Sequence, residues 1–168
     1  DTTNVFLEIA LFDPVRTATT GRKLDVMSDA RYRFERGVDP TSALWGAEIA
    51  SKLILEICGG EASELTIAGA EPDWARHQPL RKARITALGG VHLPPDEPAQ
   101  ILTLLGFDND DDGEVIHASI PPWRPDIDGE ADLVEEVLRI HGYHNIPVVP
   151  LDRDSVVPHP ALDAGQKR

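Results

Sequence analysis

The stretch from residue 121 to residue 147 constrains the fold more than any other part of the chain. It reads PPWRPDIDGEADLVEEVLRIHGYHNIP, a proline-rich turn followed by an amphipathic helix. The internal prolines fix φ angles and push the residues before them towards extended geometry. The helix is predicted over residues 131–140, with Asp128 as its N-cap and Gly142 as its stop. A helix of this kind requires a core to cover its apolar face.

The two faces of this helix differ in character. At 100° per residue, five apolar side chains share one broad face: Leu133, Val134, Val137, Leu138 and Ile140. Asp132, Glu135 and Glu136 fall together on the other face, and Asp126 lies just upstream. Each exposed like-charge pair costs roughly a few tenths of a kcal/mol. Arg139 relieves this repulsion, or else a hard cation such as Mg²⁺, which takes oxygen ligands. Spacing alone is compatible with two interpretations of this face, a solvated acidic surface and a metal site.

Charge and composition argue against several classes of protein. The net charge of −13 over 168 residues disfavours a nucleic-acid cradle, which needs a basic surface. The single cysteine, Cys58, cannot form an internal disulfide, so a reducing cytoplasm is the expected location. No apolar run approaches the ~20 residues that span a membrane, so no membrane partner is expected. Both ends of the sequence favour a piece of a longer protein.

The first part of the chain is predicted to open with a buried strand. Both faces of residues 4–12 are largely apolar, which is typical of a strand covered on two sides. Glu8 is the exception. A carboxylate among apolar neighbours needs a partner, or its pKa rises. Glu8 is therefore either an acid paired with an arginine or a recognition carboxylate.

The remaining elements are predicted from caps, turns and periodicity. In order, they are a helix from Pro14 to about Gly21 capped by Asp13, a helix over 30–36 capped by Ser28 or Asp29, a helix over about 41–57, strands over 61–68 and 81–88, a helix from about Pro94 to Gly106, an acidic turn over 108–113 and a strand over 114–120. The acidic turn lacks the register of a calcium loop, so a solvated hairpin is expected. Three arginines in the second helix are expected to pair with nearby acids rather than with RNA. The chain as a whole is predicted to be α+β.

The later motifs resemble one family. Trp123-Arg-Pro-Asp126, Glu130-Ala-Asp-Leu-Val-Glu-Glu-Val137 and Gly142-Tyr-His-Asn-Ile-Pro147 are similar to the end of the B-five domain of the bacterial phenylalanyl-tRNA synthetase beta subunit. The resemblance implies a Mg²⁺ site shared with the alpha subunit and formed by Asp126, Asp132, Glu135 and Glu136. It also implies a small winged-helix-like domain of the DNA-binding type. DNA is not expected as a partner, because the last helix is acidic.

The earlier motifs resemble the same family. Thr3-Asn-Val-x-Leu-Glu8, Phe12-Asp-Pro14, Ser28-Asp-Ala30, Tyr32-Arg-Phe-Glu-Arg-Gly-Val-Asp-Pro40 and Leu55-Glu-Ile-Cys-Gly-Gly-Glu-Ala62 are similar to the C-terminal part of its B-three/four domain. That domain is the editing module, which hydrolyses tyrosine wrongly attached to the phenylalanine tRNA. The family's editing glutamate matches Glu8, its small pocket residue matches Ala30, and Ser28 stands where the family has threonine. A carboxylate that accepts the tyrosine hydroxyl can discriminate by roughly 10⁴. The family's editing histidines have no match in this chain, so it should not edit alone.

The resemblance also implies a domain organisation and a function. Residues 1–69 would be the editing-domain segment, 70–79 a linker, 80–150 the B-five domain and 151–168 the lead-in to a catalytic-like module. The whole beta subunit, in an alpha2beta2 heterotetramer, would attach phenylalanine to tRNA(Phe) with ATP as substrate. This part would contribute editing surface, Mg²⁺ binding and subunit packing. A stand-alone nucleic-acid- or protein-binding module that reuses these folds is the alternative, and the acidic charge counts against it.

Overall fold

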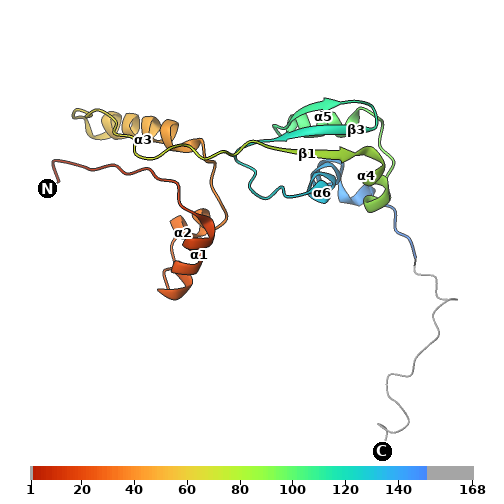
Figure 1. Ribbon diagram of the computed structural model, residues 1–168, viewed down its shortest axis with the longest axis horizontal. Helices are drawn as coiled ribbons and strands as arrows, with labels where there is room; N and C mark the ends of the chain where they lie inside the picture. The colour runs from red at the N-terminus through yellow and green to blue at the C-terminus, as the bar shows by residue number, and fades with distance from the viewer. Residues whose placement is uncertain (1, 151–168) are drawn as a thin grey trace, which may run out of the picture.

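The computed structural model describes residues 2–150, which form two regions of different compactness (Figure 1). The first region holds three helices joined by long loops: α1 (Pro14–Lys23), α2 (Asp29–Phe34) and α3 (Ser42–Cys58). The second region begins at residue 76 and combines a small sheet with helices. The predicted α+β class is confirmed.

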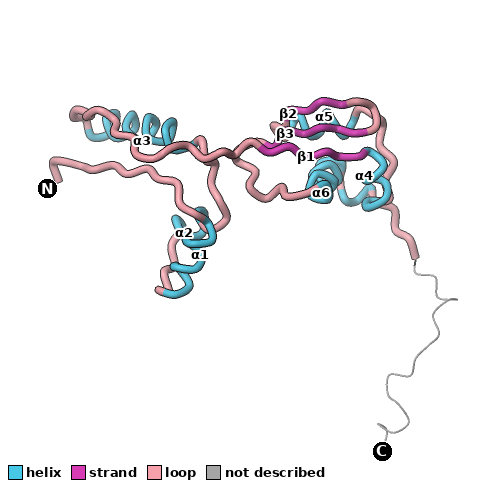
Figure 2. The backbone as a smooth tube through the Cα atoms, in the orientation of Figure 1, coloured by secondary structure: helices cyan, strands magenta, loops and turns pink. Residues whose placement is uncertain are grey.

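The second region is built on a three-stranded antiparallel sheet with the order β1-β3-β2 (Figure 2). Its elements are β1 (Arg76–Arg81), α4 (Lys82–Gly89), α5 (Glu97–Leu104), β2 (Asp108–Asp111), β3 (Val115–Ile120), α6 (Glu130–His141) and a 3₁₀ turn (Tyr143–Asn145). Strand β1 pairs with β3 along its whole length, from Arg76 opposite Ile120 to Arg81 opposite Val115. Helix α6 packs against α4, α5 and β1, and this packing places it at the centre of the region.

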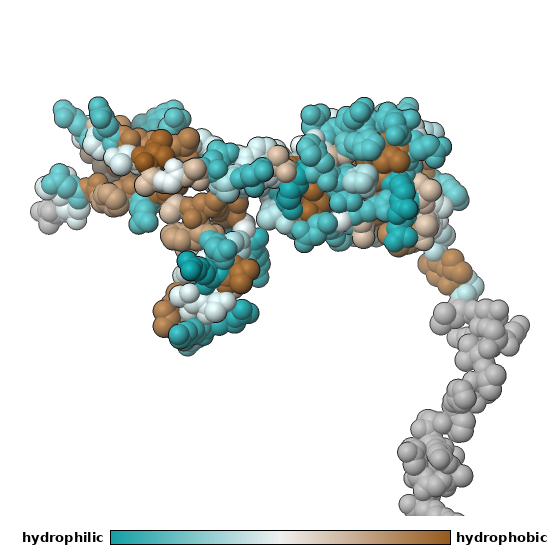
Figure 3. Space-filling view, viewed as in Figure 1, coloured by the Kyte–Doolittle hydropathy of each residue, from teal (hydrophilic) through white to brown (hydrophobic). Residues whose placement is uncertain are grey.

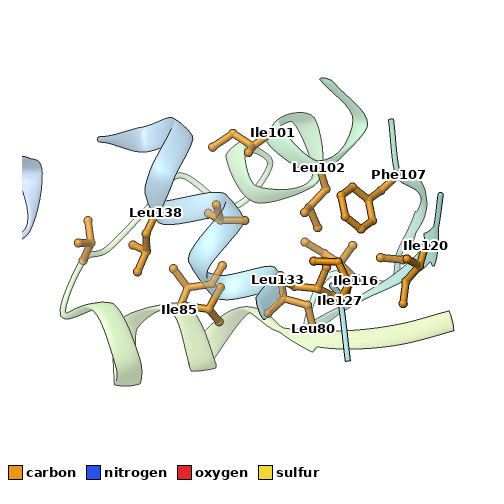
Figure 4. Packing of buried hydrophobic residues seen from close by; sticks show 14 residues of the cluster. Leu80, Ile85, Ile101, Leu102, Phe107, Ile116, Ile120, Ile127, Leu133 and Leu138 are labelled. Carbon is orange, nitrogen blue, oxygen red and sulfur yellow. The ribbon is translucent and has the colours of Figure 1, made fainter. Parts of the chain in front are cut away.

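A single hydrophobic core holds these elements together (Figure 4). Its buried members come from α4, α5, α6, β1, β3 and the loops between them: Leu80, Ile85, Val91, Ile101, Leu102, Phe107, Ile116, Ala118, Ile120, Ile127, Leu133, Val134, Val137 and Leu138. The predicted apolar face of α6 is therefore confirmed at four positions. It is wrong at Ile140, which is 45% exposed near the end of the helix.

The predicted strand over 81–88 is wrong, because these residues form helix α4. The strand lies earlier, as β1, which begins inside the stretch predicted to be a linker and extends past its end. Pro79 favoured the linker prediction, yet an edge strand tolerates proline. A β-carbon built at Gly89 would lie 2.7 Å from Leu138 Cδ1, so glycine allows α4 to approach α6 closely. The predictions of α5, β3 and α6 are confirmed to within a few residues.

The first region lacks such a core. Among residues 2–68 only Gly21 and Ala47 are buried, and Phe6 and Met27 are 91% and 85% exposed. Apolar side chains accordingly gather on the surface of this region, whereas polar residues dominate the visible face of the other (Figure 3). The predicted strands over 4–12 and 61–68 are wrong: the structure shows no regular secondary structure there. A strand requires a hydrogen-bonding neighbour, and no described segment pairs with either stretch.

The N-caps of the first two helices are residues that the sequence offers as caps. Asp13 Oδ1 accepts a hydrogen bond from the Arg16 backbone N–H at 2.7 Å, and Ser28 Oγ accepts one from the Arg31 N–H at 3.1 Å. Both side chains satisfy N–H groups that a helix start leaves free. The expected arginine–acid pairing is present for two of the three arginines, since Arg31 and Arg36 both contact Glu35. Within the described residues, no helix is both long and apolar enough to cross a membrane.

Candidate functional site

The proline-rich loop folds back onto α6 and brings two of the predicted metal-binding carboxylates to a single arginine. Arg124 Nε and Nη2 donate to the Asp126 carboxylate, at 2.9 Å to Oδ1 and 2.6 Å to Oδ2. The third nitrogen, Nη1, donates to Glu136 Oε2 at 2.9 Å. The guanidinium therefore lies between a loop carboxylate and a helix carboxylate.

Glu136 is the buried member of this cluster. Its side chain is 10% exposed, and it also accepts hydrogen bonds from Arg139, at 2.6 Å from Nη2 to Oε2. Burial raises the pKa of Glu136, but the hydrogen bonds from Arg139 and Arg124 outweigh this effect and hold the pKa below its usual value. The Arg124 guanidinium likewise lowers the pKa of Asp126. Both groups are thus stabilised as carboxylates.

The other two predicted ligands have different surroundings. Asp132 Oδ2 accepts hydrogen bonds from the backbone N–H groups of Asp128 and Gly129, each at 2.8 Å. The N-cap of α6 is therefore Gly129 rather than the predicted Asp128, and Asp132 supplies the capping carboxylate from the first turn. Glu135 is exposed on the same helix.

The residue types suit Mg²⁺, which prefers hard oxygen ligands. The arrangement in this structure does not suit it, because three of the four carboxylates are already engaged by N–H donors. Among residues 2–150, no group of three or more acidic, histidine or cysteine side chains is placed to hold a metal ion. The four-carboxylate site therefore stays a prediction, and its ligands would have to rearrange to share one ion.

Two arginines that position this cluster were not identified from the sequence. The sequence predicts only Arg139 as an arginine that neutralises these acids, whereas the structure adds Arg124. Arg76, at the start of β1, donates to two backbone carbonyls of the loop, at 2.9 Å to Ile127 O and 2.6 Å to Arg124 O. The position of Arg124 between two prolines, two residues before an aspartate, was the available signal.

The predicted editing residues lie in the first region. Ala30 lines a largely apolar groove of about 630 Å³ between α1 and α2, together with Phe12 and Phe34. Glu8 and Ser28 are not among the residues that line this groove. Glu8 is exposed rather than surrounded by apolar neighbours, so the predicted buried environment is wrong. The Ser28 hydroxyl is occupied as the N-cap of α2.

Family models match most of the chain. The tRNA synthetase B5 domain model, the B-five domain named above, matches residues 79–143, and the B3/4 domain model matches residues 1–59. The first match covers nearly all of the compact region, and the second covers the three helices before it. The fold and these matches define the class of protein as a component of an aminoacyl-tRNA synthetase.

Sequence identity to known proteins defines the family within this class. The chain is 55% identical, over its full length, to the phenylalanine–tRNA ligase beta subunit of Rhodospirillum rubrum. It is 52% identical to that of Paramagnetospirillum magneticum over 99% of its length, and 45% identical to that of Mesorhizobium japonicum over its full length. It spans 21% of each of these proteins. The chain belongs to the phenylalanine–tRNA ligase beta-subunit family.

Proposed function

We propose that this chain is a segment of a subunit that, with an alpha partner, attaches phenylalanine to tRNA(Phe) with ATP as substrate, in the cytoplasm. The observation that carries the proposal is the high identity to ligase beta subunits across the whole chain. Within that protein, this segment supplies part of a tyrosyl-tRNA editing surface, Mg²⁺ ligands and packing surface for the alpha subunit. A stand-alone nucleic-acid binder is disfavoured by the net charge of −13 and by the acidic face of α6.

The packing role is supported by the contrast between the interior and the surface of α6. Its apolar residues are enclosed within the compact region, so they are not free to bind a partner. Its exposed residues include Glu135, Arg139 and Ile140, which form a mixed surface of the kind found at subunit interfaces. Activation of phenylalanine belongs to the alpha subunit in this proposal, and this segment contributes no catalytic residue to that step.

The editing role is tested at Glu8 in the complete alpha–beta enzyme. Glu8→Ala should leave aminoacylation nearly intact and slow hydrolysis of tyrosyl-tRNA(Phe) by about tenfold or more, because it removes the acceptor for the tyrosine hydroxyl. Release of radiolabelled tyrosine from preformed tyrosyl-tRNA measures this rate. Glu64→Gln, another exposed acid of the first region, is the control. Unchanged hydrolysis in the Glu8 variant rejects the role.

The metal role is tested by Asp132→Asn combined with Glu135→Gln in the same complete enzyme. Asparagine still accepts the capping hydrogen bonds of Asp132, so helix α6 should persist while ligand charge is lost. We expect the Mg²⁺ concentration for half-maximal assembly with alpha to rise by about tenfold. Sizing chromatography across a Mg²⁺ series measures it, with Asp73→Asn and Glu64→Gln as a charge-matched control. Assembly that persists at low Mg²⁺ means that these acids form only a solvated face.

A further inference from the structure

The cluster around Arg124 has a charge balance that bears on cation binding. Two carboxylates, Asp126 and Glu136, face two guanidinium groups, Arg124 and Arg139, so the cluster is neutral. Guanidinium nitrogens lie 2.6–2.9 Å from oxygens of both carboxylates, which are the distances of charge-assisted hydrogen bonds. A divalent ion added to this arrangement would be an excess charge next to two cations.

The Arg124 side chain occupies the space that separates the two carboxylates. Its forked geometry places the Nε/Nη2 edge on Asp126 and the Nη1 nitrogen on Glu136. An ion that bound both carboxylates directly would need oxygen distances of 2.0–2.1 Å for Mg²⁺. Such an ion would compete with the guanidinium for these oxygens and for the space between them.

We propose that Arg124 is an internal cation that keeps Asp126 and Glu136 closed to Mg²⁺, so that the metal binds only when this side chain moves away. The inference rests on the proposed metal site and adds a condition for its occupation. It accounts for the mismatch between a suitable set of ligand residues and an arrangement in which guanidinium groups already engage two of the carboxylates.

The backbone around Arg124 supports a movement confined to the side chain. Its carbonyl accepts a hydrogen bond from Arg76 Nη2, and its N–H donates to Pro121 O at 3.0 Å. The loop is therefore held without the guanidinium. The Arg124 side chain is 18% exposed, so it has a path to solvent, and the Phe107 ring lies 5.7 Å from its Cζ atom. The carboxylates would remain near each other after the side chain leaves.

The test is a Mn²⁺ titration of the 168-residue chain, with Mn²⁺ as a paramagnetic probe for Mg²⁺. Arg124→Gln should bind Mn²⁺ with a Kd about tenfold lower than the unchanged chain, because one competing positive charge is gone. Arg124→Lys keeps the charge on a side chain without the fork, and it should show a smaller gain. Arg84→Gln removes an arginine that contacts Glu130 instead and should show none.

Several results would overturn the proposal. Circular dichroism identifies the Arg124 variants that remain folded. If their Mn²⁺ affinity equals that of the unchanged chain, Arg124 does not exclude the ion from Asp126 and Glu136. In the unchanged chain, NMR detection of the Arg124 Nε–H gives a second measurement. This signal should shift when Mg²⁺ saturates the site, and saturation without any shift contradicts the competition.

One further variant separates this inference from the proposed metal site. Asp132→Asn and Glu135→Gln are added to Arg124→Gln. Loss of the Mn²⁺ affinity gained supports both the closure by Arg124 and the four-carboxylate site. Retention of that gain supports the closure and rejects the four-ligand site, because Asp126 and Glu136 then suffice.

Discussion

The two regions of this chain use their apolar residues in different ways. In residues 76–146, strands and helices enclose a continuous core, and Leu80, Leu102 and Leu133 are fully buried. In residues 2–68, the helices are well formed, but Leu44, Trp45 and Ile49 on α3 are each about half exposed. Local signals suffice to form helices in both regions. Only the second region also contains the segments that cover them.

This difference indicates which region accounts for the free energy of unfolding of the chain. Ordering a residue costs roughly 1–2 kcal/mol of backbone entropy, which apolar burial must offset. The second region has that burial and the first does not. Cooperative unfolding of this chain should therefore report on residues 76–146, and changes in the first region should hardly affect it.

The largest expected effect comes from truncating the core of the second region. Leu133→Ala should lower the free energy of unfolding by about 2–5 kcal/mol, because it leaves a cavity in a fully buried site. Leu44→Ala is the matched change on α3, where the side chain is 48% exposed, and it should cost less than about 1 kcal/mol. Urea unfolding followed by circular dichroism compares the two. Equal costs would mean that the first region shares a core with the second.

An intermediate effect is expected at Glu130, which links α6 to the end of β1. Its carboxylate accepts hydrogen bonds from the Arg81 backbone N–H and side chain at 2.6–2.9 Å, and these lower the pKa of Glu130 to about 2. A lowered folded-state pKa stabilises the fold at pH values above the unfolded-state pKa of about 4.3. This stabilisation is lost as the pH falls towards 2. Because the pair meets solvent, its contribution is about 1 kcal/mol or less.

Glu130→Gln should therefore reduce stability at pH 7 and shrink the loss of stability between pH 5 and pH 2. Thermal unfolding over this pH range measures both changes. Glu64→Gln, on an exposed loop of the first region, should leave the profile unchanged. An unaltered profile in the Glu130 variant would show that the Arg81 contact contributes no net stability.

The smallest expected effect is at the N-cap of α2, which is compared with the cap of α6. Asp132→Ala removes the cap of α6 and should cost about 1 kcal/mol in cooperative unfolding. Ser28→Ala removes the cap of α2, yet it should leave cooperative unfolding unchanged, because α2 adds nothing to the core. Amide exchange should nevertheless accelerate within α2. A global cost for Ser28→Ala similar to that of Asp132→Ala would contradict the division into two regions.

The sequence was most informative where structure depends on neighbouring residues. Asp13 was correctly predicted as a cap, Ser28 was one of two caps predicted for the next helix, and the apolar residues of α6 were assigned to the correct face at four positions. These features depend on side chains three or four residues apart. The strand predicted over 4–12 was wrong because alternating apolar residues say nothing of whether a second strand is present.

The candidate site was predicted less completely for a similar reason. A helical projection placed Glu136 on the polar face with Asp132 and Glu135. In the structure it is buried, because the loop carrying Arg124 folds across that part of the helix. The projection describes one helix and omits whatever crosses it. Charge partners separated by twelve residues, such as Arg124 and Glu136, follow from the tertiary fold alone.

Strand β1 has a mechanical consequence for the link between the regions. It continues the line of the connecting segment, and all six of its residues lie opposite β3 (Figure 1). A force applied to the first region would act on all the residue pairs between β1 and β3 together, in shear. It would not separate these pairs one after another. The same force would reach the Arg124 loop through the guanidinium of Arg76. Tension in the connecting segment would thereby act directly on the acidic end of α6.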